Sequence, residues 1–136
     1  MSLTVYRKAH FNAAHRLYRK EWTDQENFDF FGKCSNPNYH GHNYELEVGI
    51  TGEIDEKTGF LMDMNMLRKL IDEEIVEAFD HKNLNIEVPE FKTLNPTMEN
   101  ISMVIWDKLR KRIDPKLKIT VKLYETPRNY VVFKGR

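Results

Sequence analysis

The sequence is poor in cysteine, in net charge and in long apolar runs, and each shortage excludes a class of protein. Cys34 is the single cysteine in 136 residues, so an internal disulfide is excluded and Cys34 is either a reduced thiol or a metal ligand. Lysine plus arginine and aspartate plus glutamate number 21 each, and this zero formal charge argues against non-specific binding of nucleic acid. The chain has no apolar run long enough to span a bilayer and no secretory signal at its start. We therefore expect a cytoplasmic protein with neither nucleic acid nor a membrane as a partner.

What is present is the composition of an ordinary globular domain. Hydrophobic residues make up 40% of the chain and charged residues 31%. The sequence has no repeat, no low-complexity stretch and no linker. A chain of this length builds one hydrophobic core, so we expect a single domain spanning residues 1–136.

Apolar periodicity predicts the order strand, strand, helix, helix, strand, strand. Asp63 and Thr97 stand where helix N-caps are expected, and the second helix should stop at the pair Asp114-Pro115. Residues 16–38 show no regular period and are expected to form a long functional loop, in which the stretch DQENFDFF suits a short helix. The predicted strands are 3–14, 40–54, a short 60–62, 117–125 and 130–134, and the first predicted helix is about 64–79. These elements fit the α+β class, with an antiparallel sheet and helices on one face.

Three histidines are candidates for a metal site. Residues i and i+2 of a strand point to the same side, so His40 and His42 project together, and His15 ends an earlier strand on the parity of its apolar face. Three neutral imidazoles suit zinc and leave a fourth coordination position for substrate. Two alternatives stay open: a chance pair of histidines, or a closed structural site with Cys34 as the fourth ligand. His10 has the opposite parity to His15 and should face away.

Three further polar residues stand at suggestive places. Glu125 continues the apolar row of its strand, so it is either at a solvated strand end or held for a polar ligand in a pocket. Asp80 and His81 follow the first long helix. An aspartate beside a histidine can orient the imidazole for proton transfer, but polar residues also commonly finish helices. Periodicity alone does not separate these alternatives.

Taken together, these residues resemble the 6-pyruvoyl-tetrahydropterin synthase family. The resemblance rests on motifs in the same order along nearly the whole chain: AAHRL, FGKCSNPNYHGHNY, GEID followed by TG, FDHKNLN, PTMENIS followed by IW, and LYETP. The related 6-carboxytetrahydropterin synthases of the queuosine pathway share most motifs but commonly have three residues between the cysteine and the HGH pair. Here five residues separate Cys34 from His40, as in the pyruvoyl branch. Tyr39 departs from the family, which usually has glycine before HGH, and a tyrosine limits positive φ.

The resemblance implies a tunnelling fold, with a four-stranded antiparallel sheet and two helices packed on one face. It implies a zinc-dependent lyase that converts 7,8-dihydroneopterin triphosphate to 6-pyruvoyl-tetrahydropterin and releases triphosphate. The alternatives are 6-carboxytetrahydropterin synthesis from the same substrate and a non-catalytic protein with structural zinc. It further implies a homohexamer, a dimer of trimers, with active sites between subunits. Carried over by motif, the roles are one Zn²⁺ per subunit held by His15, His40 and His42, a catalytic base in Cys34, a proton relay in Asp80 and His81, and a pterin anchor in Glu125.

Overall fold

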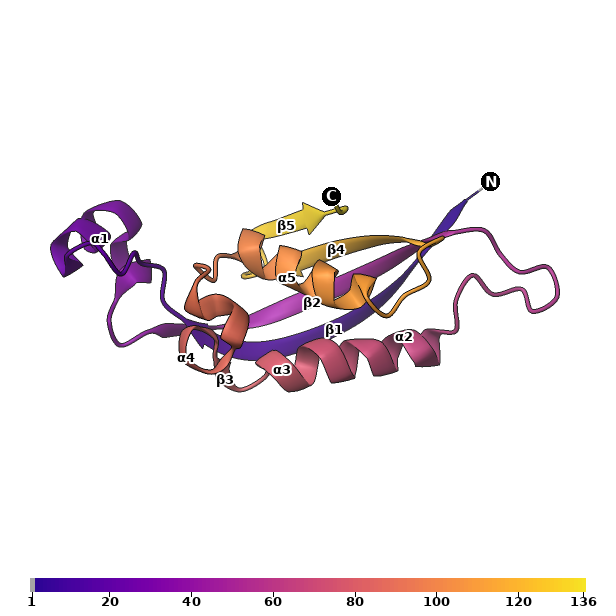
Figure 1. Ribbon diagram of the computed structural model, residues 1–136, viewed down its shortest axis with the longest axis horizontal. Helices are drawn as coiled ribbons and strands as arrows, with labels where there is room; N and C mark the ends of the chain where they lie inside the picture. The colour runs from indigo at the N-terminus through magenta and orange to yellow at the C-terminus, as the bar shows by residue number, and fades with distance from the viewer. Residues whose placement is uncertain (1) are drawn as a thin grey trace.

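The computed structural model describes residues 2–136, and it consists of a curved sheet with helices packed against it (Figure 1). The strand order is β3-β1-β2-β4-β5, and every pair except β3 with β1 is antiparallel. The strands are β1 (Leu3–His15), β2 (His40–Gly52), β3 (Lys82–Asn83), β4 (Lys118–Tyr124) and β5 (Tyr130–Phe133). The predicted α+β class with an antiparallel four-stranded sheet is confirmed, and β3 adds a two-residue parallel strand at the end of β1.

Four helices of the described chain begin at polar caps, two of which the sequence predicted. The side chains of Asp63 and Thr97 accept backbone N–H groups in the first turns of α2 and α5, and Thr23 caps α1. The helices are α1 (Asp24–Phe31), α2 (Met64–Ile71), α3 (Glu77–Phe79), α4 (Leu84–Glu87) and α5 (Met98–Arg110), with 3₁₀ turns at Gly32–Ser35 and Pro89–Lys92 and a π-helical turn at Asp72–Val76 between α2 and α3. None of the helices in residues 2–136 is long and apolar enough to cross a membrane.

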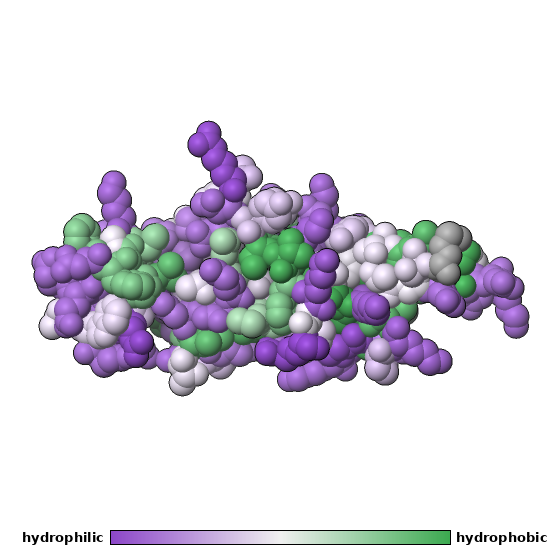
Figure 2. Space-filling view, turned by 90° about the horizontal axis from the view of Figure 1, so that it is seen from above, coloured by the Kyte–Doolittle hydropathy of each residue, from purple (hydrophilic) through white to green (hydrophobic). Residues whose placement is uncertain are grey.

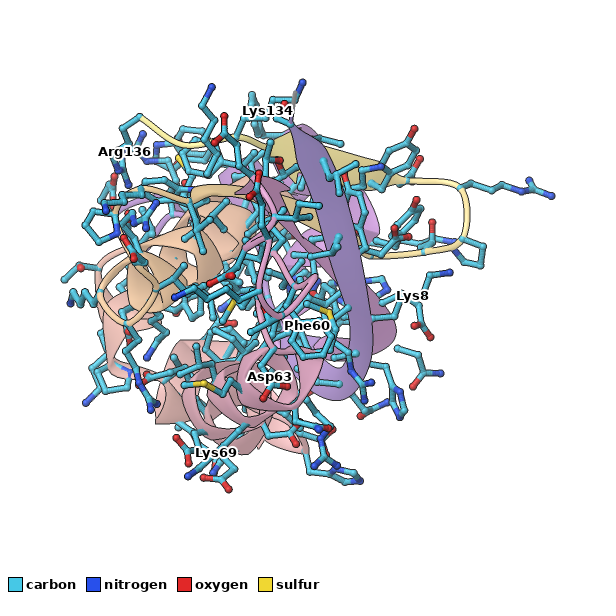
Figure 3. The ribbon with its side chains drawn as sticks, turned by 90° about the vertical axis from the view of Figure 1, so that its right-hand side faces the viewer. Lys8, Phe60, Asp63, Lys69, Lys134 and Arg136 are labelled. Atoms are coloured by element: carbon cyan, nitrogen blue, oxygen red, sulfur yellow. The ribbon has the colours of Figure 1, made fainter. Side chains whose placement is uncertain are left out.

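The hydrophobic core lies between one face of the sheet and two long helical segments, which are the continuous stretch from α2 to α3 and helix α5. The side chains on this face of the sheet alternate with outward-facing polar ones, as expected for a half-covered antiparallel sheet. Figure 3 shows the helices on one side of the strands, while the turn between β4 and β5 extends from the other side, where Lys8 also lies. The fully buried residues of this core include Phe11, Tyr44, Leu46, Ile50, Leu67, Ile71, Ile75, Phe79, Ile101, Ile105 and Leu109. This layer fixes which strand residues face inward.

Residues 60–62 do not form the predicted strand, and the second long helix ends earlier than predicted. Within the described chain, residues 60–62 pair with no strand. The Asp55 N–H donates to the Phe60 carbonyl at 2.8 Å and closes a loop, from which Leu61 packs against the core. A strand needs a neighbouring strand for its hydrogen bonds, and the local pattern does not supply one. Helix α5 ends at Arg110 rather than near residue 113, and the Arg110 guanidinium donates to the carbonyls of the turn that follows.

Segments extend from both ends of the sheet (Figure 1). Helix α1 and the loops around it form one end, and the loop of residues 53–63 forms the other. From the side on which β5 lies, apolar surface gathers at the α1 end and over the middle of the molecule (Figure 2). Phe28 and Phe30 of α1 are 57% and 72% exposed. The predicted long loop between the first two strands is therefore an aromatic-rich arm with a short helix.

Candidate active site

The three histidines meet because of how β1 and β2 pair. His15 is the last residue of β1 and lies directly opposite His40, the first residue of β2. His42 follows two residues later on the same side of β2. The ring centroid of His15 lies 4.5 Å from that of His40 and 5.0 Å from that of His42, and the centroids of His40 and His42 are 5.0 Å apart. The predicted convergence of these three imidazoles is thus present in the fold.

One nitrogen of each ring is left without a partner inside this cluster. The Nδ1 of His15 lies 2.8 Å from the Pro96 carbonyl oxygen, which only accepts, so Nδ1 carries the proton and Nε2 has the lone pair. The buried atoms His15 Nε2, His40 Nδ1 and His42 Nε2 have no hydrogen-bond partner in residues 2–136. An unpaired buried polar atom costs about 1–3 kcal/mol. Three such atoms within 4.8 Å of one another fit a tetrahedral metal ion with three nitrogen ligands.

Burial keeps these imidazoles neutral, which is the form that binds a metal. It lowers the pKa of His15 to about 4, and the Pro96 carbonyl offsets only part of that effect. Burial also lowers the pKa of His40, with a further contribution from neighbouring His42, and burial lowers the pKa of His42. A neutral imidazole offers a lone pair at neutral pH. The cluster is therefore ready to bind a cation without first releasing protons.

Metal-free protein should lose stability as the pH falls from 7 to 5. Above pH 6.5 His15 is neutral in both folded and unfolded chains. Between the unfolded value of 6.5 and the folded pKa of about 4 only the unfolded chain binds the proton, so the free energy of unfolding falls. We expect a loss of about 2 kcal/mol from His15 between pH 7 and pH 5, measured by urea unfolding in the presence of a chelator. His10→Gln, an exposed control, should keep this pH dependence. A stability that is unchanged over this range would contradict the prediction.

Glu125 stands beside the histidine cluster. It follows the last residue of β4, and its backbone N–H donates to the Asn129 carbonyl across the turn. Its carboxylate oxygens lie 3.9 Å from His15 Nε2 and 4.0 Å from His42 Nε2, and its side chain is 20% exposed. Burial raises the pKa of the Glu125 carboxyl, with His40 acting in the opposite direction. The parity of the strand thus continues past its end and brings a carboxylate to the histidines.

A cavity of about 650 Å³ opens at this carboxylate. His42 and Glu125 form part of its wall, and Tyr124 and Lys8 contribute from the other face of the sheet. The volume lies in the range of sites for small organic ligands, about 300–1,000 Å³. A ligand in this cavity would meet one histidine of the cluster, His42, and the Glu125 carboxylate at the same place.

Cys34 is not one of the converging ligands. The cluster that the described residues offer to a metal consists of the three histidines alone. Cys34 lies in the 3₁₀ turn after α1, is exposed, and its backbone carbonyl accepts the N–H of Leu17 at 2.9 Å. Leu17 is only two residues beyond His15. The 3₁₀ turn Gly32–Ser35, here called the thiol loop, is therefore bound to the segment just after His15 but supplies no fourth ligand.

Asp80 and His81 form a pair at the outer edge of β1. Asp80 Oδ1 accepts the backbone N–H of Asn12 at 2.8 Å, and Oδ2 lies 2.9 Å from His81 Nδ1. The Asn12 N–H and then the His81 hydrogen bond lower the pKa of Asp80. The His81 ring is 82% exposed, and its backbone N–H donates to the Asn12 carbonyl. In residues 2–136 the hydrogen bonds and ion pairs of this pair involve Asn12, the Val76 carbonyl and each other, not the three histidines.

Two non-glycine residues of these segments have positive φ. Tyr39 has φ 67° and His81 has φ 59°. The left-handed region costs an L-residue roughly 1–2 kcal/mol, so the surroundings hold both backbones in place. We expected tyrosine to limit positive φ before the HGH pair, and Tyr39 instead adopts it, with its N–H donated to the Asn36 carbonyl at 3.0 Å.

Sequence reasoning missed two residues that hold His15. The Pro96 carbonyl lies in the segment before α5, and Pro96 carries no motif that links it to a histidine 81 positions away. The Tyr44 hydroxyl lies 3.3 Å from His15 Nδ1, and the Tyr44 ring stacks on Phe11 with centroids 4.9 Å apart. Burial raises the pKa of Tyr44. Tyr44 lies two residues after His42 on the same strand, so both side chains point to the same side. This was the one sequence signal that Tyr44 could lie near the histidines.

Comparison with known proteins assigns the chain to one family. The family described as 6-pyruvoyl tetrahydropterin synthase matches residues 4–136. The chain is 49% identical over 131 residues to 6-pyruvoyl tetrahydrobiopterin synthase of Pongo abelii, and 47% identical over 131 residues to that of Homo sapiens; each match covers 96% of this chain and 90% of the relative. The solved structure of Caenorhabditis elegans 6-pyruvoyl tetrahydropterin synthase has a TM-score of 0.93 and 37% identity, covering 100% of this chain and 97% of that chain.

Proposed function

This chain belongs to the 6-pyruvoyl tetrahydropterin synthase family, and we infer from that membership that it is a lyase of tetrahydrobiopterin biosynthesis. It converts 7,8-dihydroneopterin triphosphate to 6-pyruvoyl-tetrahydropterin and releases triphosphate. The single observation in the structure that carries this function is the histidine cluster with Glu125 beside it, where His42 and Glu125 line a cavity of ligand size. A purely structural metal site requires neither the adjacent carboxylate nor the cavity.

The metal in our proposal is one Zn²⁺ per chain, held by His15, His40 and His42. Nitrogen ligands in a three-histidine set suit zinc, and the set leaves a coordination position for substrate oxygen. When bound, zinc supplies a Lewis acid that polarises the hydroxyl groups of the substrate side chain and makes the adjacent C–H groups more acidic. The lone pairs that lack partners in this cluster support the proposal.

We assign the proton transfers to Cys34, Asp80 and His81. Elimination of triphosphate with internal movement of hydrogens needs a base that takes a proton from carbon and an acid that returns one. Cys34 is the base, because a thiolate is a good proton acceptor near neutral pH. Asp80 orients His81 through the 2.9 Å contact, and His81 relays the proton. Glu125 binds the donor-rich edge of the pterin through charge-assisted hydrogen bonds.

The assembly we propose is a homohexamer, a dimer of trimers, whose active sites lie between subunits. Two features of the chain support it. Within residues 2–136 the outer edge of β1 is paired with β3 only at Ala13 and Ala14, so most of this 13-residue strand has no neighbouring strand there on that side. Such edges favour pairing with another chain. Asp80 and His81 stand at that edge, apart from the histidines of their own chain. They therefore serve the site of an adjacent subunit.

Product analysis tests the proposed reaction directly. Zinc-loaded protein incubated with 7,8-dihydroneopterin triphosphate should release one triphosphate per 6-pyruvoyl-tetrahydropterin, without an added reductant. Formation of 6-carboxytetrahydropterin from the same substrate would instead place the chain in the queuosine branch. Full zinc content with no turnover of this substrate would support the non-catalytic alternative and would contradict the proposed function.

Glu125→Gln should weaken pterin binding while the protein stays folded. The substitution keeps the shape of the side chain but removes the charge that faces the cavity. A hydrogen bond to a charged group contributes about 1.5–3 kcal/mol, so affinity for a pterin such as sepiapterin should fall about tenfold to a hundredfold, measured by calorimetry. Glu53→Gln, at an exposed carboxylate beyond the end of β2, is the matched control. Unchanged affinity in Glu125→Gln would contradict a role in pterin binding and would support the alternative that Glu125 is a polar residue at a solvated strand end.

A further inference from the structure

Arg16 joins the metal-binding strand to the loop that carries the thiol. It directly follows His15, and its side chain is only 12% exposed. Its Nε donates to the carbonyl of Ser35 at 2.7 Å. The next residue, Leu17, donates its backbone N–H to the Cys34 carbonyl at 2.9 Å. Two consecutive residues after the histidine thus bind the two carbonyls at and after Cys34.

The Arg16 side chain and backbone are themselves fixed. The amide of Asn85 accepts the Arg16 N–H at 2.8 Å and donates to the Arg16 carbonyl at 2.9 Å. The guanidinium lies over the Tyr18 ring, 3.8 Å from its centroid, and reaches the carboxylate of Asp24 at 3.4 Å. A charged group this well buried is held by its partners and not by solvent. Arg16 is therefore a rigid link between β1 and the arm.

Few other hydrogen bonds hold the thiol loop. The 3₁₀ turn Gly32–Ser35 bonds locally, through Ser35 Oγ to the Gly32 carbonyl, and to the end of α1 that precedes it. In the part of the chain that the structure describes, the hydrogen bonds that tie this turn to more distant segments are those from Arg16 and Leu17. The Leu17 bond is made by the backbone and does not depend on a side chain. Among these longer-range bonds of the turn, the one made by a side chain is therefore that of Arg16.

We propose that Arg16 is a positioning residue for the Cys34 thiol: it sets the distance between the thiol and the substrate held at the histidine cluster. The inference rests on the proposed role of Cys34 as the base. A base has to stand within hydrogen-bond reach of the proton that it takes, and a misplacement of about 1 Å costs about a hundredfold in rate. The planar fork of arginine suits this task because it binds Ser35 and Asp24 in fixed directions, which the single ammonium of lysine does not do.

The test compares Arg16→Met in two backgrounds. In the parent protein, Arg16→Met should lower kcat about a hundredfold, with zinc content unchanged and KM changed less than about threefold. In Cys34→Ala it should change the residual activity less than about twofold, because effects of residues that act as a unit do not add. Arg19→Met is the matched control, since the Arg19 guanidinium contacts Glu21 and the Trp22 ring and not the thiol loop.

A second readout follows the thiol itself. Cys34 is the single cysteine, so alkylation by iodoacetamide reports on it alone. Bound sepiapterin should slow this alkylation in the parent protein and in Arg19→Met. In Arg16→Met the protection should be lost although calorimetry shows sepiapterin still bound. Protection equal to that of the parent would contradict a positioning role.

The outcomes separate the inference from the proposed function. Full turnover in Cys34→Ala overturns the assignment of Cys34 as the base and, with it, the role of Arg16, while the lyase reaction itself stands. Loss of turnover in Cys34→Ala with full kcat in Arg16→Met overturns only the role of Arg16, as does an equal loss in both backgrounds, which would indicate a general effect on the fold. If Arg16→Met does not fold, Arg16→Lys keeps the charge and should still lower kcat about tenfold with zinc retained. Full activity in Arg16→Lys would then overturn the inference.

Discussion

His42→Ala is expected to lose both bound zinc and activity. The three histidine nitrogens are the ligand atoms that converge in this fold, so the site has none to spare when one is removed. Two ligands hold a metal ion far less tightly than three, and turnover that depends on the metal should fall to background. Elemental analysis after dialysis measures the zinc, and product formation measures the activity.

The control for this substitution is His10→Ala. His10 lies on the same strand as His15 but on its opposite face, and it is exposed. It should keep full zinc and full turnover. Full metal content in His42→Ala would exclude the proposed ligand set, whatever the activity of the variant. Loss of zinc in both variants would indicate that removal of any histidine disturbs the strand pair.

Cys34→Ala is expected to keep zinc and lose turnover. The three histidines and the open coordination position remain, so zinc and substrate should still bind. Turnover should fall by roughly 10²–10⁴, the range typical of a lost general base. Metal analysis, calorimetry with sepiapterin and product formation measure the three quantities separately.

If Cys34 were instead the fourth ligand of a structural zinc site, Cys34→Ala would have a different effect. A thiolate that closed a structural zinc site would contribute to folding through the metal. Cys34→Ala would then release zinc and lower the melting temperature by many degrees. Cys34→Ser is the matched control, because a hydroxyl keeps nearly the shape of the thiol and is a far weaker base at neutral pH. Release of zinc by Cys34→Ala together with a large drop in melting temperature would overturn the mechanism.

The sequence by itself determined which side chains share a face. Strand parity placed His40 and His42 together, set His10 apart from His15, and put Glu125 in line with the apolar residues of β4. Polar caps marked the starts of α2 and α5. These features are local, because side-chain direction in a strand and capping at a helix end depend on neighbouring residues. The motif order added the family, which no local pattern predicts.

Which side chains could hold a metal together was open until the register was known. With five residues between Cys34 and the HGH pair, the cysteine has enough chain to reach a metal or to lie away from it, so the spacing does not determine the role of Cys34. The antiparallel register sets His15 opposite His40, and the arm that follows β1 is bound through Leu17 to the Cys34 backbone. Only this long-range pairing decides that the cluster consists of three imidazoles.

Tertiary structure also decided the conformations that local preference opposes. Tyr39 and His81 take positive φ values, and residues 60–62 remain a loop despite their apolar character. A strand needs a neighbouring strand, and a strained backbone needs contacts to hold it. The His81 N–H donates to the distant Asn12 carbonyl, and the Tyr39 N–H donates to the nearby Asn36 carbonyl. The contact of Pro96 with His15, across 81 positions, also depends on the fold: backbone carbonyls look alike in every sequence, and only the folded chain selects the one that orients the metal ligand.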